Sequence, residues 1–383
     1  MAKLDAVIVG AGPAGAATAI TLARAGRSVA VLEKRAKLRF NVAETLAPNA
    51  VGVATHFIGP LDQALGQNAF HTRGNISLWG NDTPDQHDFF YSPAGAGYCV
   101  NRQHFDAAFR SAAHDTGAQI ITDAAVTRCE YSGDWTTHYN SKSGPQTITS
   151  TYLIDASGRA ASVAKSLGVA KDQDDPLFSF AMRFVTTEPC PEDAHTRIEA
   201  SPFGWWYSNA LPVGENGTQE RVIVLHTDKD LAQAKQAATP TGFLDLLKGT
   251  KLMAPHLAAN GYTAMGKVQG APAGNARLAP DNLSNFLAVG DAAQALDPLS
   301  SQGIHQALLS ASFAGQMVNY ALSNDAPSFL DRYTRDQDKR WAHYQKEYAH
   351  FYAMESRWPD HPFWNRRQHT HSNFEKETAR DVL

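Results

Sequence analysis

Hydrophobic positions at the N-terminus form an unbroken run, then a helical pattern, then a second run. Residues 6–9 are all apolar, residues 14–25 carry apolar side chains at helical spacing, and the next apolar run ends at Glu33. Uninterrupted short apolar runs are typical of strands that are buried on both faces, as in parallel sheets. The order strand, helix, strand therefore predicts a βαβ unit.

Two further segments repeat the buried pattern, whereas a long middle segment does not. Residues 101–121 predict a helix and a strand, and residues 149–159 predict a strand that runs into a turn. Between 178 and 270, apolar and polar residues alternate, which is typical of antiparallel strands. A buried strand returns at 281–291, and residues 332–358 predict a long helix that carries aromatic and charged side chains.

These patterns predict an α/β protein whose Rossmann-like domain is interrupted by a second domain. The second domain is expected to be a mostly antiparallel sheet, because nucleotide-type segments lie on both sides of it. A C-terminal helical segment with an aromatic and basic tail completes the chain. The expected boundaries are 1–75, 97–175 and 271–330 for the Rossmann-like domain, 76–96 and 176–270 for the inserted sheet, and 331–383 for the C-terminal segment.

Composition and charge narrow the possible partners. The 383 residues are 43% hydrophobic and 19% charged, with a formal net charge of −4. Such a chain folds but lacks the basic character of nucleic-acid-binding proteins, so no nucleic-acid partner is expected. Cys99, Cys129 and Cys190 lie far apart and form no CxxC pair, so neither a disulfide framework nor a metal site is expected.

The uncharged run at 6–23 has the length of a signal peptide or a short membrane span. It contains Gly10, Gly12, Pro13 and Gly15, which a membrane helix does not need but a strand–turn–helix does. No membrane association is therefore expected, and the cytoplasm is the expected compartment.

The stretch "GAGPAG" follows a strand and opens a helix, which is the context of a dinucleotide-binding turn. Gly10 permits the tight turn, Gly12 allows a pyrophosphate to approach the backbone, and Gly15 allows close packing of helix and strand. The helix N-terminus attracts the phosphates, and Glu33 can bind the adenosine ribose. The motif alone fits both FAD and NAD. Neighbouring residues expected to bind the same cofactor are Pro13, Ala14, Lys34 and Arg35.

A second turn, "VGDAAQALDPLSSQGI", favours a flavin over NAD. Its first acid follows a buried strand and can bind ribityl hydroxyls, and the proline can lie against a flat ring. The helix that starts at the last glycine can face the ring edge that becomes negative on reduction. NAD has neither a ribityl chain nor an anionic ring. The residues expected to bind the flavin here are Gly290, Asp291, Pro298, Gly303 and Ile304.

With these two turns, Arg102 in "VNRQHFD" and the turn "DASGR", the chain resembles the FAD-dependent monooxygenase superfamily of the aromatic hydroxylase type. The resemblance implies that Arg102, Asp155 and Gly158 contact FAD. It also implies a reduced flavin that forms a C4a-hydroperoxide with oxygen and transfers OH to an electron-rich ring. The electron donor would be NAD(P)H or a reductase. The turn Asp-Ala-Ser-Gly departs from the family's Asp-Gly pattern.

The segments "AETLAPNA", "HTRGNISLWG" and "GWWYSNALP" resemble the flavin halogenase branch of this superfamily. The branch carries a Trp-x-Trp-x-Ile-Pro signature, which is absent here, and a catalytic lysine, at whose place this chain has His71. Halogenation needs a cation to hold hypohalous acid, and a histidine, which is not a permanent cation, is a poor substitute. The sequence therefore argues against a halogenase.

The motifs "SLWG", "GWWYSNALP" with "HTDKD", and "RWPDHPFWNRR" resemble the LodB/GoxB-type flavoproteins that partner tryptophylquinone enzymes. This resemblance implies hydroxylation of a tryptophan side chain in a precursor protein during biogenesis of a cysteine tryptophylquinone. Arginine and tryptophan in the last motif suit a docking surface, but the same tryptophans can pack the C-terminal segment onto the protein. Hydroxylation of a small aromatic molecule, a halogenase-like activity, an isoprenoid-type FAD reductase and a non-catalytic flavin protein remain alternatives.

Seven residues are candidates for the reacting part of the site. Each also has a structural interpretation, since tryptophans fill cores, a histidine can be a hydrogen-bonded core residue and an aspartate before proline is common in turns. The candidate catalytic residues are His71, Glu44, Trp206 and Asp297, and the candidate substrate-pocket residues are Trp79, Trp205 and Tyr207.

Overall fold

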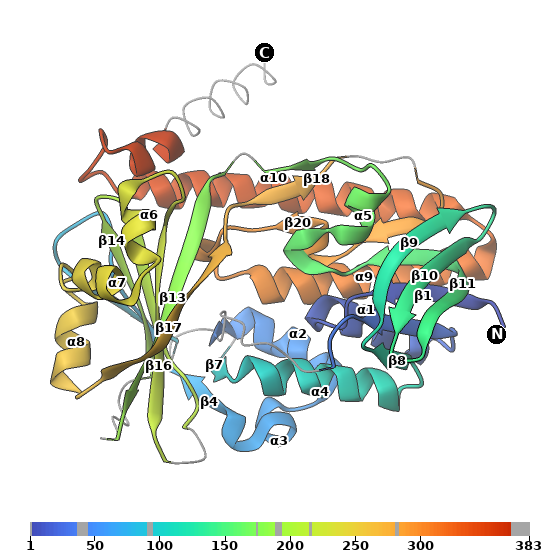
Figure 1. Ribbon diagram of the computed structural model, residues 1–383, viewed down its shortest axis with the longest axis horizontal. Helices are drawn as coiled ribbons and strands as arrows, with labels where there is room; N and C mark the ends of the chain where they lie inside the picture. The colour runs from blue at the N-terminus through green and yellow to red at the C-terminus, as the bar shows by residue number, and fades with distance from the viewer. Residues whose placement is uncertain are drawn as a thin grey trace.

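A computed structural model describes residues 2–36, 45–89, 95–173, 175–187, 194–213, 217–279 and 283–368. The molecule has two lobes, a sheet covered by helices and a second sheet, and one long helix runs along both of them (Figure 1). The predicted class, a Rossmann-like α/β fold with a mostly antiparallel second sheet and a C-terminal helix, is confirmed.

The first lobe is built on a seven-stranded sheet in the order β8-β2-β1-β11-β10-β9, with β19 also paired to β11. The strands β8, β2, β1, β11 and β19 are parallel, whereas β9 and β10 extend β11 as an antiparallel meander. The meander was not predicted from the sequence. The strands are β1 (Leu4–Val9), β2 (Val29–Glu33), β8 (Gln119–Thr122), β9 (Ala125–Tyr131), β10 (Trp135–Ser141), β11 (Gly144–Asp155) and β19 (Phe286–Ala288).

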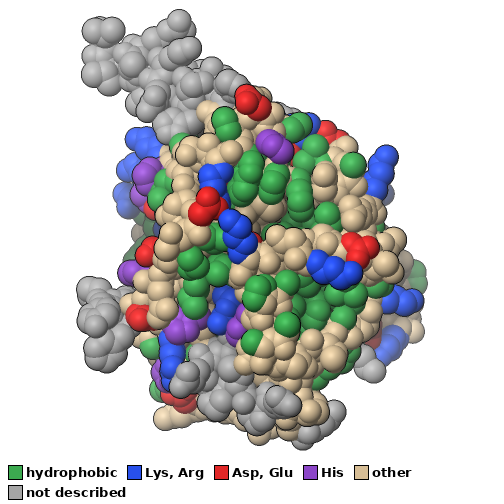
Figure 2. Space-filling model, turned by 90° about the vertical axis from the view of Figure 1, so that its left-hand side faces the viewer, with side chains coloured by type: hydrophobic (Ala, Val, Ile, Leu, Met, Phe, Trp, Pro, Cys, Tyr) green, Lys and Arg blue, Asp and Glu red, His purple; other side chains and the backbone are tan. Residues whose placement is uncertain are grey.

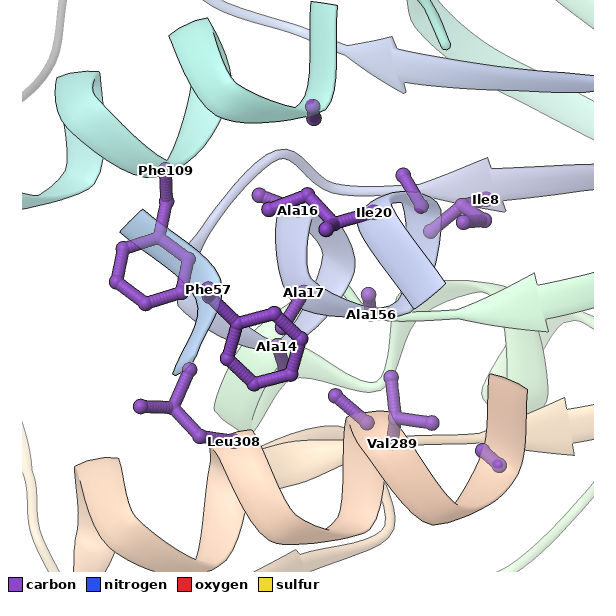
Figure 3. Packing of buried hydrophobic residues seen from close by; sticks show 14 of the residues in the cluster. Ile8, Ala14, Ala16, Ala17, Ile20, Phe57, Phe109, Ala156, Val289 and Leu308 are labelled. Atoms are coloured by element: carbon purple, nitrogen blue, oxygen red, sulfur yellow. The ribbon is translucent and has the colours of Figure 1, made fainter. Parts of the chain in front are cut away.

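Helix α1 (Pro13–Arg24) lies between α4 (Arg102–Asp115) and α9 (Gly303–Asn324), as Figure 3 shows. Its alanines allow this close approach, because Ala16 and Ala17 are fully buried and present little bulk to the neighbouring helices. Gly315 of α9 meets α1 directly, since a Cβ there would lie 2.8 Å from Cβ of Thr21. Smaller helices complete this lobe: α2 (Pro48–Ile58), α3 (Leu61–Leu65) and α5 (Ser162–Ser166).

The second lobe is a seven-stranded sheet in the order β17-β13-β16-β15-β14-β5-β6. All neighbours are antiparallel except β14 and β5. The alternation at 178–270 therefore predicted the sheet but missed the helices α6, α7 and α8, which cover its outer face (Figure 1). The elements are β5 (Gly74–Leu78), β6 (Asp85–Asp88), β13 (Leu177–Thr186), β14 (His195–Ser201), β15 (Gly204–Ala210), β16 (Gln219–Asp228), β17 (Thr263–Pro272), α6 (Ala232–Ala237), α7 (Pro240–Leu247) and α8 (Met253–Ala259).

Two small sheets connect the lobes, in the orders β3-β7-β4 and β12-β18-β20. The predicted long helix is α10 (Leu330–Met354), which passes from the first lobe to the second (Figure 1). Among the described residues, no helix has both the length and the apolar run needed to cross a membrane. The strands are β3 (Thr45–Leu46), β4 (Ala69–Thr72), β7 (Gly97–Val100), β12 (Lys171–Asp172), β18 (Ala276–Leu278) and β20 (Gln294–Ala295).

The segment after α10 folds back onto the second lobe and is largely buried. Trp364 and Phe363 are fully buried, and the indole Nε1 of Trp364 donates to the carbonyl oxygen of Ser201 at 2.8 Å. Packing, the second of the two interpretations given for this motif, therefore describes these side chains. Figure 2 shows the left-hand end of the molecule in Figure 1, where groups of hydrophobic side chains lie among scattered Lys, Arg, Asp and Glu side chains.

Candidate functional site

The motifs found in the sequence meet at the carboxyl ends of neighbouring parallel strands. Strand β1 ends before the turn that begins with Gly10, β2 ends at Glu33, β11 ends at Asp155, and β19 ends two residues before Gly290. Since β2, β1, β11 and β19 are side by side, these four turns share one edge of the sheet. This is the edge at which open α/β sheets bind their ligands.

Packing of the protein itself requires two of the three glycines in the first turn. Gly10 has a φ of +108°, and a Cβ there would lie 2.4 Å from the carbonyl oxygen of Ala156. A Cβ on Gly15 would lie 1.9 Å from the carbonyl oxygen of Gly10. Both positions therefore exclude a side chain, because the turn approaches β11 and α1 approaches the turn.

Gly12 has no such packing constraint, because a Cβ there would meet no atom within 4 Å. Its backbone is extended, and as the N-cap residue of α1 it has no side chain to cap the helix. Helix α1 starts at Pro13 and has no acidic residue in its first turn. The N-cap of α1 therefore makes no side-chain hydrogen bond, and the space where a Cβ on Gly12 would lie is open. This is the arrangement that a helix N-terminus offers to a phosphate.

Glu33 and the neighbouring cations make hydrogen bonds and an ion pair around this turn. The Glu33 carboxylate accepts from the N–H of Ala11 at 2.9 Å and from the N–H of Arg35 at 3.1 Å. Lys34, which lies between Glu33 and Arg35 in the sequence, is exposed. Sequence reasoning missed Arg110, whose Nε donates to the carbonyl oxygen of Ala11 at 2.8 Å and whose Nη2 lies 3.4 Å from Glu33 Oε2.

The second turn packs against the first. Gly290 has a φ of +57°, and a Cβ there would lie 2.8 Å from Cβ of Ala14 at the start of α1. Asp291 follows it with a side chain that is 36% exposed, and its Oδ2 lies 3.6 Å from Nε of Arg159. The carboxylate of Asp291 is thus partly accessible, in a turn that packs against the start of α1.

The start of α9 is open in the same way as the start of α1. A Cβ on Gly303 would meet no atom within 4 Å, and Gln302 before it makes no side-chain cap. Ile304 packs against the core of the first lobe, and Pro298 begins a short 3₁₀ turn that leads to the helix. Two uncapped helix N-termini and an accessible acid fit a flavin dinucleotide better than a compact ligand.

Asp155 and Arg102, both expected to touch the cofactor, make hydrogen bonds within the protein. The buried carboxylate of Asp155 accepts from the N–H groups of Ser157, Val163 and Ala164 at 2.9 to 3.0 Å, so it holds its own turn and the start of α5. Arg102 makes two hydrogen bonds to the carboxylate of Asp106, at 3.1 and 3.2 Å.

The remaining member of the "DASGR" turn, Gly158, is left open. It has a φ of +69°, and a Cβ there would meet no atom within 4 Å. A ligand could therefore approach the backbone of this turn at Gly158.

Asp297, directly before Pro298, belongs to a buried hydrogen-bond network. Its carboxylate accepts from the hydroxyl of Tyr352 at 2.9 Å and from the N–H of Leu299 at 2.8 Å. The indole of Trp205 in turn donates to the Tyr352 hydroxyl at 3.0 Å. Asp297 is 1% exposed, so this placement supports a bracing role for the turn, in place of the direct catalytic contact predicted from the sequence.

Burial raises the pKa of Asp297 to about 7, with the nearby carboxylate of Asp175 adding to the shift. The folded state then binds more protons than the unfolded state between roughly pH 4 and pH 7, so this group's contribution to stability is present at acidic pH and is lost as the pH rises. In Asp297→Asn, we expect that pH dependence to disappear. Relative to wild type, the variant should gain about 1 kcal/mol or more in the free energy of unfolding between pH 5 and pH 8. Urea unfolding at both pH values measures this, and an unchanged pH dependence would contradict the ionisation of Asp297.

The tryptophan pair of β15 splits between the two faces of its sheet. Trp206 is fully buried on the outer face, with its ring centroid 5.3 Å from that of Phe243 in α7. The predicted catalytic role of Trp206 therefore has no geometric support, since a period of two directs it away from the first lobe. Tyr207 faces inward, and its hydroxyl lies 2.8 Å from Oγ1 of Thr45 in β3.

Two further predicted pocket residues belong to an aromatic cluster with the C-terminal segment. Trp205 stacks on His226 with ring centroids 3.9 Å apart, and Trp79 contacts the rings of Trp205, Tyr352 and Trp364. The Trp79 indole donates to the carbonyl oxygen of Phe351 in α10 at 2.8 Å. Their contacts are thus those of a core, and Tyr207 is the pocket candidate that faces the lobe boundary.

His71 points away from this boundary. It is paired with Tyr98 across β4 and β7, and paired residues share a face of the sheet. Tyr98 belongs to the core of the first lobe, whereas the next residue, Cys99, bonds to the carbonyl oxygen of Ala210 in β15. The His71 side chain is 58% exposed and lies beside Asp62 of α3, which does not fit the predicted catalytic position.

Glu44, the last catalytic candidate, lies outside the described residues. In the first turn of α9, His305 is a residue that the sequence reasoning passed over. Its Nδ1 lies 3.4 Å from Nδ2 of Asn49, and burial, with the charge of Arg340, lowers its pKa. A neutral imidazole here stands beside the helix start that a flavin ring would face. Its position directly after the Gly303–Ile304 pair was the available signal.

Comparison with known proteins covers both lobes. The profile described as FAD binding domain matches residues 3–346. LodB of Marinomonas mediterranea, named an FAD-dependent oxidoreductase, is 28% identical over 371 residues, which are 96% of this chain and 97% of LodB.

Two solved structures share the fold. The myxobacterial chondrochloren halogenase CndH has a TM-score of 0.86 and 20% identity, and the match covers 100% of this chain and 90% of that one. The peptidyl tryptophan dihydroxylase QhpG, described as essential for tryptophylquinone cofactor biogenesis, has a TM-score of 0.72 and 23% identity, with 96% and 79% covered.

Proposed function

Since the chain belongs to the FAD-binding domain family and is a flavin-dependent oxidoreductase, we propose that it is a monooxygenase that hydroxylates an indole ring. The ring is that of a tryptophan side chain in a partner precursor protein, at an early stage of cysteine tryptophylquinone formation. One oxygen atom of O₂ replaces a ring hydrogen as OH, the other leaves as water, and reduced flavin supplies the two electrons. The resemblance to this superfamily and to LodB-type flavoproteins, first seen in the motifs, is confirmed by the matches.

The observation that carries the proposal is the combination of two likenesses. The sequence aligns with LodB over nearly the full length of both chains, and the fold is shared with QhpG, a peptidyl tryptophan dihydroxylase. When bound, FAD would supply the oxygen chemistry. The residues that would hold it lie at the strand ends, Tyr207 and Thr45 lie at the lobe boundary, and the buried Asp297 network would brace the turn that carries Pro298.

The strands around that boundary argue against halogenation. β3, β4, β7 and β15 contain no lysine that could hold hypohalous acid, and His71 on β4 faces α3. Electron-rich indole needs no such cation to accept OH. Hydroxylation of a small aromatic molecule is the second outcome that the experiment must distinguish.

The test is the intact mass of proteins that co-purify with this protein from its native cells. The comparison uses wild-type cells, cells without the protein and cells that carry Gly12→Val, which should keep the fold but not hold FAD. We expect a partner that is heavier by one or two oxygen atoms only in wild-type cells, with the oxygen mapped to a tryptophan. A partner with the same added oxygen in all three strains would overturn the proposal. A partner that is never oxidised, together with oxygen consumption stimulated by free indoles or phenols, would establish the small-molecule alternative.

A further inference from the structure

Lys171 lies outside every motif, yet it contacts two of them at once. It begins β12, which pairs with β18 beside the cofactor turns. Its Nζ donates to the carbonyl oxygen of Arg159 at 3.0 Å and to that of Asp291 at 2.9 Å. One ammonium group thus bridges the end of the "DASGR" turn and the acid of the "GD" turn.

Arg159 completes the cationic surroundings of Asp291. Its Nε lies 3.6 Å from the Asp291 carboxylate, and its Nη atoms donate to the carbonyl oxygens of Gly274 and Leu296 at 2.6 and 2.5 Å. Arg159 therefore orients the side chain of Asp291, whereas Lys171 fixes its backbone. Charge-assisted hydrogen bonds of this kind are about twice as strong as neutral ones.

We propose that Lys171 is a positioning residue for FAD, whose ammonium group locks the Gly158–Ala160 turn and the Gly290–Ala292 turn at a fixed separation. With that separation it sets the place of the Asp291 carboxylate relative to the cofactor. The inference concerns cofactor binding and holds whatever the substrate is.

The charges around Lys171 make its action dependent on pH. Burial lowers the pKa of Lys171 to about 8, Asp291 and Asp155 oppose the shift, and Lys165 and Arg159 add to it. On β18, Arg277 is turned toward Asp338 of α10 and does not compete for the two carbonyls. Its guanidinium pairs with the carboxylate of Asp338.

Protonated Lys171 holds the turns by charge-assisted bonds, and a bound dinucleotide adds negative charge nearby, so FAD binding should favour the protonated form. The affinity for FAD should then fall as the pH rises through about 8. The stability of the protein without FAD responds in the opposite direction. A lysine whose pKa is lowered on folding binds fewer protons in the folded state, so its contribution to stability rises between about pH 8 and pH 10.

The test compares three variants by the dissociation constant of FAD, measured from the fluorescence of FAD released when the holoprotein is diluted. Lys171→Met, which removes both hydrogen bonds, should weaken binding about tenfold or more. Lys171→Arg keeps charge and donors and should recover most of the affinity. The matched control is Lys165→Met, which removes an exposed charge from the same surroundings and should change the constant less than about threefold.

A pH series separates positioning from a general loss of structure. In wild type the dissociation constant should rise from about pH 7 to about pH 9, and in Lys171→Met it should be flat. In Lys165→Met the rise should move to higher pH, because the neighbouring positive charge is gone. The proposal is overturned if Lys171→Met and Lys165→Met weaken binding equally, or if the wild-type constant does not change over this range. If Lys171→Met does not fold, the pH series in wild type and Lys165→Met and the affinity of Lys171→Arg decide it.

Discussion

Replacing Gly12 by valine is expected to abolish FAD binding without unfolding the protein. The position tolerates a side chain as far as the protein is concerned, because its φ of −75° and ψ of −178° are extended and a Cβ would meet no atom within 4 Å. The valine would instead fill the space over the start of α1, where the pyrophosphate must approach the backbone. We expect purified Gly12→Val to lack flavin absorbance, with an affinity for FAD reduced by about a hundredfold or more.

The matched variant is Gly15→Ala, which changes the packing of the same turn within the protein instead of the space for the ligand. Its Cβ would collide with the carbonyl oxygen of Gly10, so the free energy of unfolding should fall by about 1–3 kcal/mol even without FAD. Thermal unfolding of both variants without FAD provides the measurement. If Gly12→Val were as unstable as Gly15→Ala, or if it kept its flavin, the assignment of Gly12 to the ligand would be wrong.

Replacing Arg367 by methionine is expected to cause the largest loss of stability. The guanidinium is 3% exposed and donates to both oxygens of Asp228, at 2.8 and 3.2 Å, and to Asp175 at 3.0 Å. It also lies 3.8 Å from the ring centroid of Phe363. Without it, two buried carboxylates lose their main counter-charge, which typically costs about 3–5 kcal/mol. Denaturant unfolding should show this loss as a lower midpoint.

Arg366 is the natural control, since it bonds to Asp228 and Asp230 but its side chain is 38% exposed. Solvent screens an ion pair at such a position, so Arg366→Met should lose only about 1 kcal/mol or less. Adding Asp228→Asn to Arg367→Met should recover part of the lost stability, because it removes one uncompensated charge. Equal losses for the two arginine variants would show that burial does not govern this cluster.

The glycine turns that follow buried strands lie where the sequence predicted them. The turns at Gly10 and Gly290 are read directly from short apolar runs that end in glycine, and both signals are local. The hydrophobic period also predicted the second sheet. It could not distinguish the helices α6 to α8 within that segment, because short helices between strands add little to the pattern of a long alternating region.

The candidate catalytic residues were harder to predict, because their roles depend on which face of a strand they occupy. His71 and Trp206 each lie one residue from a position that faces the lobe boundary, and a period of two sends both to the opposite side. Asp297 was identified as a possible turn acid, but its hydrogen-bond donor Tyr352 lies far along the chain on α10. Arg110 and Lys171 carry no motif, and only the meeting of distant turns gives them a role.

The sequence by itself determined the Rossmann-like core, the two glycine turns and hence the cofactor, because these depend on hydrophobic period, glycine backbone freedom and residues that are close in sequence. Only the tertiary structure decided which polar groups are accessible to a ligand and which form hydrogen bonds within the protein. Asp155 and Asp291 each follow a buried strand in the sequence. The carboxylate of Asp155 accepts hydrogen bonds from three backbone N–H groups, whereas that of Asp291 remains partly accessible. The physical reason is that a hydrogen-bonding group can serve a ligand only where the fold leaves it unmatched, and that matching is made by segments far apart in the chain.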